Sequence, residues 1–313
     1  MPPELLRLFQ DLDLETLRLR RPSKIIFFCG GAMDDNPRTA CSLRHYLLRD
    51  RKIEPRLKGH VVLAEAANQL YRDTDYEDLI SFEEDIARIA AVVLLIAESP
   101  GALAELGAFA AVDAIRSRLA VLIQTEHEEA DSFVRYGPLQ KLKNEAEWRL
   151  AAYPWRLNSR RVLVKASARP HVADIVRFTN DVLKRAAAEE SWRTSEDLRP
   201  FAVILWVLHL ANALTITDLH TYTDALLPTT LKDLRGRLFC MQLAGWVAKF
   251  RHGNTDYWCS TSITDPFSRY SFIPGAVRDT SRRKLEVTAA IAAELRLSRH
   301  VFARVAEKKG TAA

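Results

Sequence analysis

The chain has 313 residues, of which 48% are hydrophobic, and it carries a formal net charge of +5 at pH 7. This length and apolar content exclude a disordered chain and suffice for two domains, each with its own core. The mild basic excess permits an acidic partner such as nucleic acid but does not require one, because basic runs also lie on solvated helix faces.

The cysteines and histidines show no metal-binding spacing. The four cysteines, Cys29, Cys41, Cys240 and Cys259, are scattered and form no C-x-x-C pair, which is typical of reduced thiols. The charged N-terminal segment does not resemble a signal peptide, and no apolar run is long enough to span a bilayer. We therefore expect a soluble, cytoplasmic protein without a metal or a bound cofactor.

Helices alternate with short apolar strands in the first half of the chain. The expected elements, in chain order, are an amphipathic helix over about residues 1–20, a strand in 24–31, a helix at 41–51, a strand at 60–64, a helix at 76–90, a strand at 91–97, a helix around Ala104 and a strand at 119–125. Because each strand is nearly all apolar, this pattern predicts an α/β domain over residues 1–167, built on a doubly wound parallel sheet.

The pattern changes to a mostly helical one in the second predicted domain, residues 168–313. Helices are expected at 172–191, 201–214, 215–227 and 229–245, followed by a β-hairpin at 246–262 around a His-Gly-Asn turn. Three helices and a two-stranded wing predict a winged helix-turn-helix, with Thr230–Leu243 as its recognition helix. The side chains expected to meet nucleic-acid phosphates are Lys232, Arg235, Arg237 and Arg251. The alternative is a helical domain that contacts only protein.

Loops at the carboxyl ends of the predicted parallel strands should meet in one crevice. The residues expected to line that crevice as substrate contacts are Cys29, Gly30, Gly31, Glu65, Glu98, Ser99 and Gly101. Gly30 and Gly31 would let backbone approach a ligand closely. They form no G-x-G-x-x-G fingerprint, and the chain has no G-K-[ST] P-loop, so hydride transfer and P-loop chemistry are unsupported.

Glu105 is a single acid in a helix of alanine, leucine and glycine. Ser99 and Pro100 read as the N-cap and first residue of that helix, which places Glu105 about one and a half turns in, near the crevice. The acid is either a partner of the helix dipole or a group that acts on a substrate. Glu83, on the preceding predicted helix, can reach the same place. Two carboxyl groups in different surroundings are what cleavage of a glycosidic bond requires.

Four strings carry a family resemblance: FFCGG, SLRH, LLIAESPGALAELGAF and FVRYGPLQ, within Lys24–Leu142. They resemble the effectors encoded beside reverse transcriptases in type II retrons, which are similar to nucleoside 2-deoxyribosyltransferases with an appended winged helix. The resemblance implies a Rossmann-like first domain with Glu105 as nucleophile or as the anion that stabilises a sugar cation. It implies that Glu83 orients the base or a ribose hydroxyl. Arg44, in SLRH, would contact a phosphate or form a surface salt bridge.

The resemblance also implies a biological role. The expected protein is a toxin of anti-phage defence, restrained by a reverse transcriptase and its multicopy single-stranded DNA–RNA hybrid, in a homo-oligomer or larger assembly. Glu-Ser-Pro-Gly replaces the acid that usually opens this loop in the transferases, which favours hydrolysis over transfer. NAD is the first-choice substrate. The alternatives are an N-glycosidase of other nucleotides or deoxynucleotides, and a non-catalytic nucleotide sensor joined to a DNA-binding domain.

Overall fold

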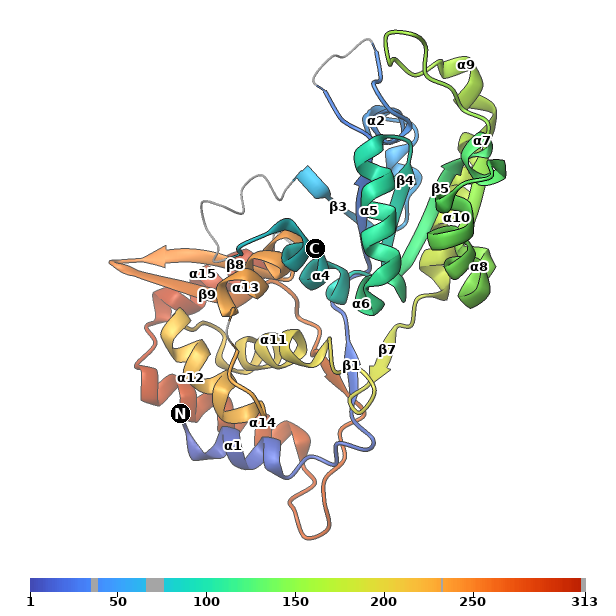
Figure 1. The fold of residues 1–313 in the computed structure, drawn as a ribbon. Helices are drawn as coiled ribbons and strands as arrows, with labels where there is room; N and C mark the ends of the chain where they lie inside the picture. The colour runs from blue at the N-terminus through green and yellow to red at the C-terminus, as the bar shows by residue number, and fades with distance from the viewer. Residues whose placement is uncertain (35–38, 66–75, 232, 311–313) are drawn as a thin grey trace. The chain divides into compact units, whose positions relative to one another are not determined.

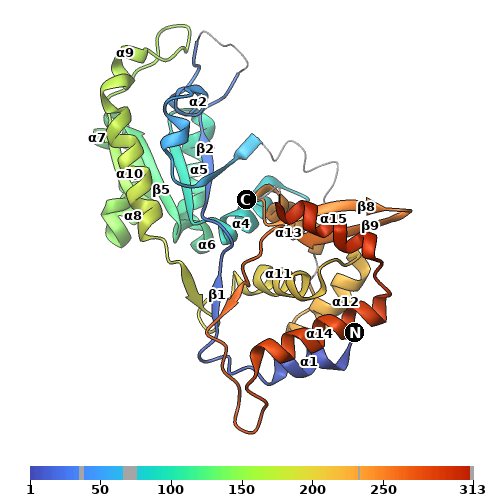
Figure 2. The ribbon, with the colours of Figure 1, turned by 180° about the vertical axis from the view of Figure 1, so that it is seen from behind.

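The computed structural model describes residues 1–34, 39–65, 76–231 and 233–310 (Figures 1 and 2). The chain divides into two compact units. The sheet unit comprises Lys24–Asn68 and Leu79–Ala187, and the helical unit comprises Met1–Ser23, Gln69–Asp78 and Ala188–Ala313. No helix of the described part of the chain is both long and apolar enough to cross a membrane.

A five-stranded parallel sheet, in the order β3-β2-β4-β5-β6, forms the centre of the sheet unit. Its strands are β2 (Ile25–Gly30), β3 (His60–Leu63), β4 (Val92–Ala97), β5 (Leu119–Gln124) and β6 (Leu150–Tyr153). The predicted parallel pairing of the first and third of these strands is confirmed, with Ile26 opposite Val92 and Gly30 opposite Ile96. The strand order reverses between β2 and β4, which is where open α/β sheets bind ligands.

Side chains alternate between the two faces of the sheet, and helices cover both faces (Figures 1 and 2). On one face Ile26 and Phe28 join a core with α2 (Leu43–Arg49) and α10 (Val172–Arg185). On the other face Phe27 meets Phe82 of α4 (Leu79–Ile89) edge to face, with ring centroids 6.1 Å apart. Burial of each such side chain contributes about 1.5–3 kcal/mol. Helix α5 (Pro100–Ala111) contacts β2 and β4.

Short elements complete the sheet unit. They are a 3₁₀ turn at Glu54–Arg56, α6 (Asp113–Arg116), α7 (Thr125–Glu129), a π-helical turn at Arg135–Leu139, α8 (Gln140–Ala146), a 3₁₀ turn at Glu147–Arg149, α9 (Lys165–Ala168) and a 3₁₀ turn at Arg169–His171.

The helical unit packs its helices beside two small antiparallel sheets. Its elements are α1 (Pro3–Gln10), β1 (Arg18–Arg20), β7 (Glu189–Ser191), α11 (Arg199–Ala211), α12 (Ile216–Leu226), α13 (Leu234–Leu243), β8 (Val247–His252), β9 (Thr255–Ser260), β10 (Phe267–Ser268), α14 (Thr280–Leu295) and α15 (Arg299–Gly310). One sheet has the order β10-β1-β7. The nearly all-apolar α11 is buried along most of its length, and its Trp206 stacks on Phe267 at 4.8 Å between centroids.

The predicted hairpin is confirmed. Strands β8 and β9 pair from Val247–Ser260 to His252–Thr255, and Gly253 takes a positive φ of 58° in the turn. Three helices precede this hairpin, in the predicted order. The expected recognition helix starts at Leu234 and not at Thr230, because Asp233 caps it by accepting a hydrogen bond from the Gly236 N–H at 2.8 Å.

The compact units differ from the predicted domains at two places. Helix α10 falls within the predicted second domain, residues 168–313. Its Val176 and Leu183 nevertheless pack into the core of the sheet unit, and that compact unit ends at Ala187. The first 23 residues belong to the helical unit. The helix expected over about 1–20 ends at Gln10, because the chain then forms β1 between β7 and β10.

Candidate active site

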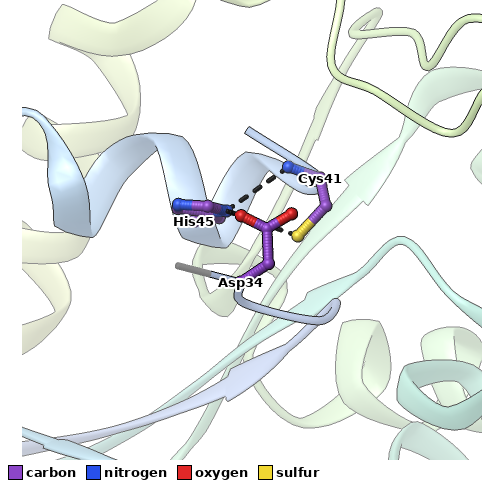
Figure 3. Close-up of side chains that lie close together, drawn as sticks. All are labelled: Asp34, Cys41 and His45. Atoms are coloured by element: carbon purple, nitrogen blue, oxygen red, sulfur yellow. Dashed lines mark hydrogen bonds and ion pairs between the residues drawn. The ribbon is translucent and has the colours of Figure 1, made fainter. Parts of the chain in front are cut away.

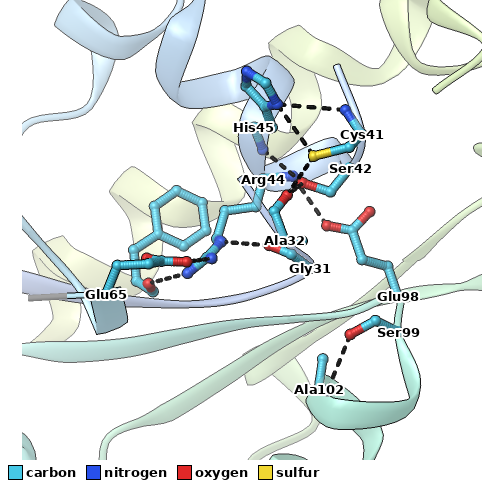
Figure 4. Close-up of polar contacts among 11 residues, drawn as sticks. Gly31, Ala32, Cys41, Ser42, Arg44, His45, Glu65, Glu98, Ser99 and Ala102 are labelled. Carbon is cyan, nitrogen blue, oxygen red and sulfur yellow. Dashed lines mark hydrogen bonds and ion pairs between the residues drawn. The ribbon is translucent and has the colours of Figure 1, made fainter. Parts of the chain in front are cut away.

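Arg44 ties together the carboxyl ends of β2 and β3. It is 2% exposed, and its guanidinium donates to the Gly31 carbonyl at 2.9 Å, to the Phe28 carbonyl at 3.1 Å and to the Glu65 carboxylate (Figure 4). The salt bridge considered for Arg44 is present, with Glu65, but the guanidinium that forms it is buried and does not lie on the surface. A contact of Arg44 with a substrate phosphate stays a prediction.

Glu98 anchors the N-terminus of α2 to the end of β4. Its two carboxylate oxygens accept hydrogen bonds from the backbone N–H groups of Leu43, at 2.6 Å, and Arg44, at 3.0 Å. Figure 4 shows the bond from Arg44. Burial raises the pKa of this carboxyl to about 7, although these N–H groups act to lower it. Because both oxygens already have partners, the geometry supports an anchoring role for Glu98.

Gly30 and Gly31 make room for protein atoms. Gly30 has a φ of +144°, and a Cβ there would lie 2.9 Å from the Ile96 carbonyl oxygen. A Cβ at Gly31 would lie 2.8 Å from the Ser42 Cβ and 2.9 Å from a Glu98 carboxylate oxygen. Close approach of the next strand and of the Glu98 anchor therefore requires these glycines. The expectation that their backbone approaches a ligand closely stays a prediction.

The start of α5 is as the sequence predicts. Ser99 is the N-cap and accepts a hydrogen bond from the Ala102 N–H at 3.1 Å, and Pro100 is the first helical residue (Figure 4). Gly101 is exposed, and apart from its chain neighbours and the backbone of its own helix no described atom lies within 4 Å of where its Cβ would be. The first turn of α5 therefore lies open beside the carboxyl edge of the sheet, where its N–H groups can meet an anion.

Glu105 has a buried carboxylate oxygen, Oε2, that no hydrogen-bond donor of the described residues contacts. Burial raises the pKa of Glu105, the positive charge of Arg44 acts to lower it, and the negative charge of Glu65 raises it further. An unpaired buried acceptor costs about 1–3 kcal/mol in a folded protein, so it calls for an explanation.

Glu83, on α4, is the second acidic side chain near Glu105. Burial raises its pKa to about 8, and the charge of Glu105 contributes to the increase. At neutral pH Glu83 therefore holds a proton, and the positive charge of Arg44 acts to lower the pKa of Glu105. Neighbouring carboxyl groups with separated pKa values are suited to acid–base work on one substrate.

Cys29 lies on the face of the sheet that faces this acid pair. Its side chain is fully buried, and burial raises the pKa of the thiol, with further increases from the charges of Glu83 and Glu105. The expectation that Cys29 touches substrate is not supported by this placement, because the thiol has no exposed surface.

A cavity of about 480 Å³ lies at the carboxyl ends of β5 and β6, along the same edge of the sheet. Gln124, Trp155 and Ser167 are among the residues that line it, and neither Glu83 nor Glu105 is. It therefore does not by itself mark the acid pair as a ligand site.

The basic side chains expected at a nucleic-acid interface differ in exposure. Arg235 and Arg251 are exposed, and Arg251 Nε donates to the Gly253 carbonyl at 3.3 Å. Arg237 packs over the Phe201 ring at 5.3 Å, and its Nε is buried without a hydrogen-bond partner. Lys232 lies outside the described residues. Arg235 and Arg251 thus remain the accessible candidates.

Sequence reasoning missed the contacts that hold the crevice together. The Glu98 carboxylate binds α2, which begins 55 residues earlier, and Arg44 reaches Glu65, 21 residues later; no local pattern links these residues. It also missed a group formed by Asp34, Cys41 and His45. The C-x-x-x-H spacing of Cys41 and His45 was the available signal, because Cys41 directly precedes the N-cap Ser42 of α2 and His45 lies in the first turn of that helix.

Comparisons with known proteins give a consistent result. A family model described as STM3845 retron effector protein matches residues 40–249. Two Escherichia coli proteins, from the retrons Ec73 and Ec86, are named as ribosyltransferase and DNA-binding proteins, with those functions given as provisional. The Ec73 protein is 25% identical over 127 residues, which are 40% of this chain and 39% of the relative. The Ec86 protein is 26% identical over 118 residues, or 38% and 37%. The match thus spans about two fifths of each relative.

Proposed function

We propose, from the premise that this chain belongs to the STM3845 retron effector protein family, that it hydrolyses an N-glycosidic bond of a nucleotide, with NAD as the first candidate. The observation that carries the proposal is the buried, unpartnered oxygen of Glu105 beside a second acid, Glu83, whose pKa is about 8. The ribosyltransferase names of the two retron relatives support chemistry at a ribosyl carbon.

The proposed reaction breaks the bond between the anomeric carbon and the base nitrogen, and the electron pair leaves with the base. The Glu105 carboxylate stabilises the resulting sugar cation or bonds to it. Water then supplies the oxygen that ends on the anomeric carbon and releases a proton. Stabilisation of charge by such a group is worth about 3–4 kcal/mol, or about 10²–10³ in rate.

Glu83 supports a second candidate, a nucleotide or deoxynucleotide with an ordinary purine or pyrimidine. Nicotinamide departs from NAD as a neutral molecule and needs no proton. A purine or pyrimidine departs as an anion unless an acid protonates it. A carboxyl group that keeps its proton at neutral pH can supply that proton, which is what the raised pKa of Glu83 provides.

The helical unit would bind the partners of the effector. We propose that α11, α12, α13 and the β8–β9 hairpin act as a winged helix, with Arg235 and Arg251 meeting the phosphates of the DNA–RNA hybrid made by the retron reverse transcriptase. In this proposal the partners restrain a toxic nucleotide hydrolase. The DNA-binding part of the relatives' names supports it.

The test is base release by the full chain, alone and with its reverse transcriptase and hybrid, on NAD and on a panel of nucleotides, followed by chromatography. Glu105→Gln should lower turnover about 10²–10³-fold on whichever nucleotide the parent cleaves. Glu54→Gln, at an exposed acid of the same unit, is the matched control and should keep parental turnover.

Two results would contradict the proposal. Parental turnover in Glu105→Gln would make that acid a helix-dipole partner only. A parent that binds nucleotide but cleaves none, in any combination with its partners, would support the non-catalytic sensor.

A further inference from the structure

Three side chains with metal-binding atoms meet where the loop after β2 returns to α2. They are Asp34, Cys41 and His45, and their ligand atoms all lie within 4.8 Å of one another (Figure 3). Among the described residues, no other set of three or more His, Cys, Asp or Glu side chains brings its metal-binding atoms this close together. They lie outside the acid pair of the proposed reaction.

The distances between these atoms fit a tetrahedral zinc ion. His45 Nδ1 lies 3.3 Å from Cys41 Sγ and 3.6 Å from Asp34 Oδ1. Zinc bonds of about 2.3 Å to sulfur and about 2.0–2.2 Å to nitrogen and oxygen, at tetrahedral angles, separate these donors by about 3.5 Å and about 3.4 Å. No large rearrangement of the three side chains is needed to bring them to one ion.

The placement of the three groups also suits a metal. His45 is 1% exposed, Cys41 is partly buried and Asp34 is exposed, so the group opens to solvent on the side of the carboxylate. Ser42 caps α2 by accepting from the backbone N–H of His45 at 2.9 Å, and the Cys41 N–H donates to His45 Nδ1 at 3.4 Å, a contact that a bound ion would replace (Figure 4). A thiolate, an imidazole and a carboxylate together favour zinc over magnesium or calcium.

We propose that Asp34, Cys41 and His45 bind one Zn²⁺ ion, with a fourth position filled by water or by an atom of a ligand. On binding, the Cys41 thiol, which donates to the Ala32 carbonyl at 2.8 Å, releases its proton to solvent and its sulfur bonds to the metal. The ion would join the loop after β2 to the first turn of α2, next to Ser42 and Arg44. This inference does not depend on the proposed reaction.

The experiment uses the full chain after treatment with a chelator. Titration with Zn²⁺, read by calorimetry, should give one ion per chain. Titration with Co²⁺ should give the near-ultraviolet absorption of a sulfur–cobalt bond and the strong visible bands of tetrahedral cobalt. Asp34→Asn, at an exposed site that tolerates substitution, should weaken Zn²⁺ binding at least about tenfold. Cys41→Ser should remove the sulfur–cobalt absorption.

His220→Gln is the matched control, because His220 Nδ1 also lies close to a carboxylate, 3.1 Å from Asp224 Oδ2. It should leave the stoichiometry and the cobalt spectrum unchanged. A parent chain that binds no Zn²⁺ would overturn the proposal. So would a sulfur–cobalt band that persists in Cys41→Ser, or Zn²⁺ affinity that falls as much in His220→Gln as in Asp34→Asn.

Discussion

Glu98 and Glu105 lie seven residues apart, on either side of the first turn of α5, and they are used in opposite ways. Glu98 gives its oxygens to two backbone N–H groups of α2 and is 7% exposed. Glu105 keeps one buried oxygen without a hydrogen-bond partner in the part of the chain that the structure describes. Burial raises the pKa of both carboxyl groups, so burial does not distinguish them. They differ in their hydrogen-bond partners.

This contrast separates an anchor from a reactive group. A carboxylate whose lone pairs are used by the backbone stabilises the fold and has little left for a ligand. A carboxylate that is partly buried and unpaired costs stability, and function is the usual reason for keeping it. At the α2 side of the crevice, Glu98 thus stabilises the fold, whereas Glu105 on α5 has an oxygen available to act on a ligand.

The largest expected effect is at Glu83, which lies on α4 near Glu105. For a nucleotide whose base needs a proton, Glu83→Gln should lower base release about 10²–10⁴-fold, because the general acid is lost. In the parent, the rate should fall as the pH rises through about 8, where Glu83 loses its proton, and this alkaline limb should be missing in the variant. Release of nicotinamide from NAD should change little. Equal losses on both substrates would assign Glu83 to substrate positioning.

On the α2 side the next effect should appear in stability. Glu98→Gln leaves the N–H of Leu43 or Arg44 facing an amide group that donates, so the variant should lose about 1–3 kcal/mol, or roughly 2–10 °C in melting temperature. Thermal unfolding followed by circular dichroism measures it. An unchanged melting temperature would remove Glu98 from the framework and return it to the substrate contacts.

In the helical unit we expect a smaller effect, on the salt dependence of DNA binding. In salt titrations of binding to a mixed-sequence DNA duplex, changing Arg235 and Arg251 together to Gln should reduce the slope of log K against log salt by about 1.8, since each phosphate contact accounts for about 0.9. Arg237→Gln is the control, because that guanidinium packs over Phe201, and it should leave the slope unchanged. A double variant with the parental slope would point to protein recognition by this unit.

The smallest expected effect is on stability, at Glu105. Folding raises the pKa of this carboxyl, so its contribution to stability is present at low pH and is lost as the pH rises through the folded-state value. Glu105→Gln should therefore match or exceed the parental melting temperature by about 1–2 °C at pH 8, and the difference should vanish near pH 4. A clear fall in melting temperature at pH 8 would mean that Glu105 has an anchoring partner after all.

The sequence predicts the strongly apolar and the strongly capped elements well. The runs that form β2 and β4 have one interpretation, and Ser99 followed by Pro100 marks the start of α5 through purely local chemistry. Strand β6, Leu-Ala-Ala-Tyr, was missed because four residues with two alanines carry little strand preference. The helix at Val172–Arg185 is predicted correctly, but the unit whose core it joins is not. An apolar stripe on a helix does not indicate which surface it packs against.

The site shows the same limit. The surroundings of Glu105 and Glu83 in the sequence single them out. Their raised pKa values, however, depend on burial and on charged groups that the fold brings near. The absence of C-x-x-C pairs led to the expectation of no metal. Asp34 lies close to Cys41 and His45 only in the folded chain, and the spacing of cysteines does not reveal that proximity.

The sheet β10-β1-β7 has a consequence for the order in which the chain can fold as it leaves the ribosome. Residues 18–20 pair with residues 189–191 on one side and with residues 267–268 on the other. At a translation rate of about 5–20 residues per second, β10 is synthesised on the order of tens of seconds after β1. The whole of Lys24–Ala187, which holds the acid pair, has been translated before β7 and β10 emerge. The nascent chain therefore has the residues of its candidate catalytic unit available before the helical unit can close.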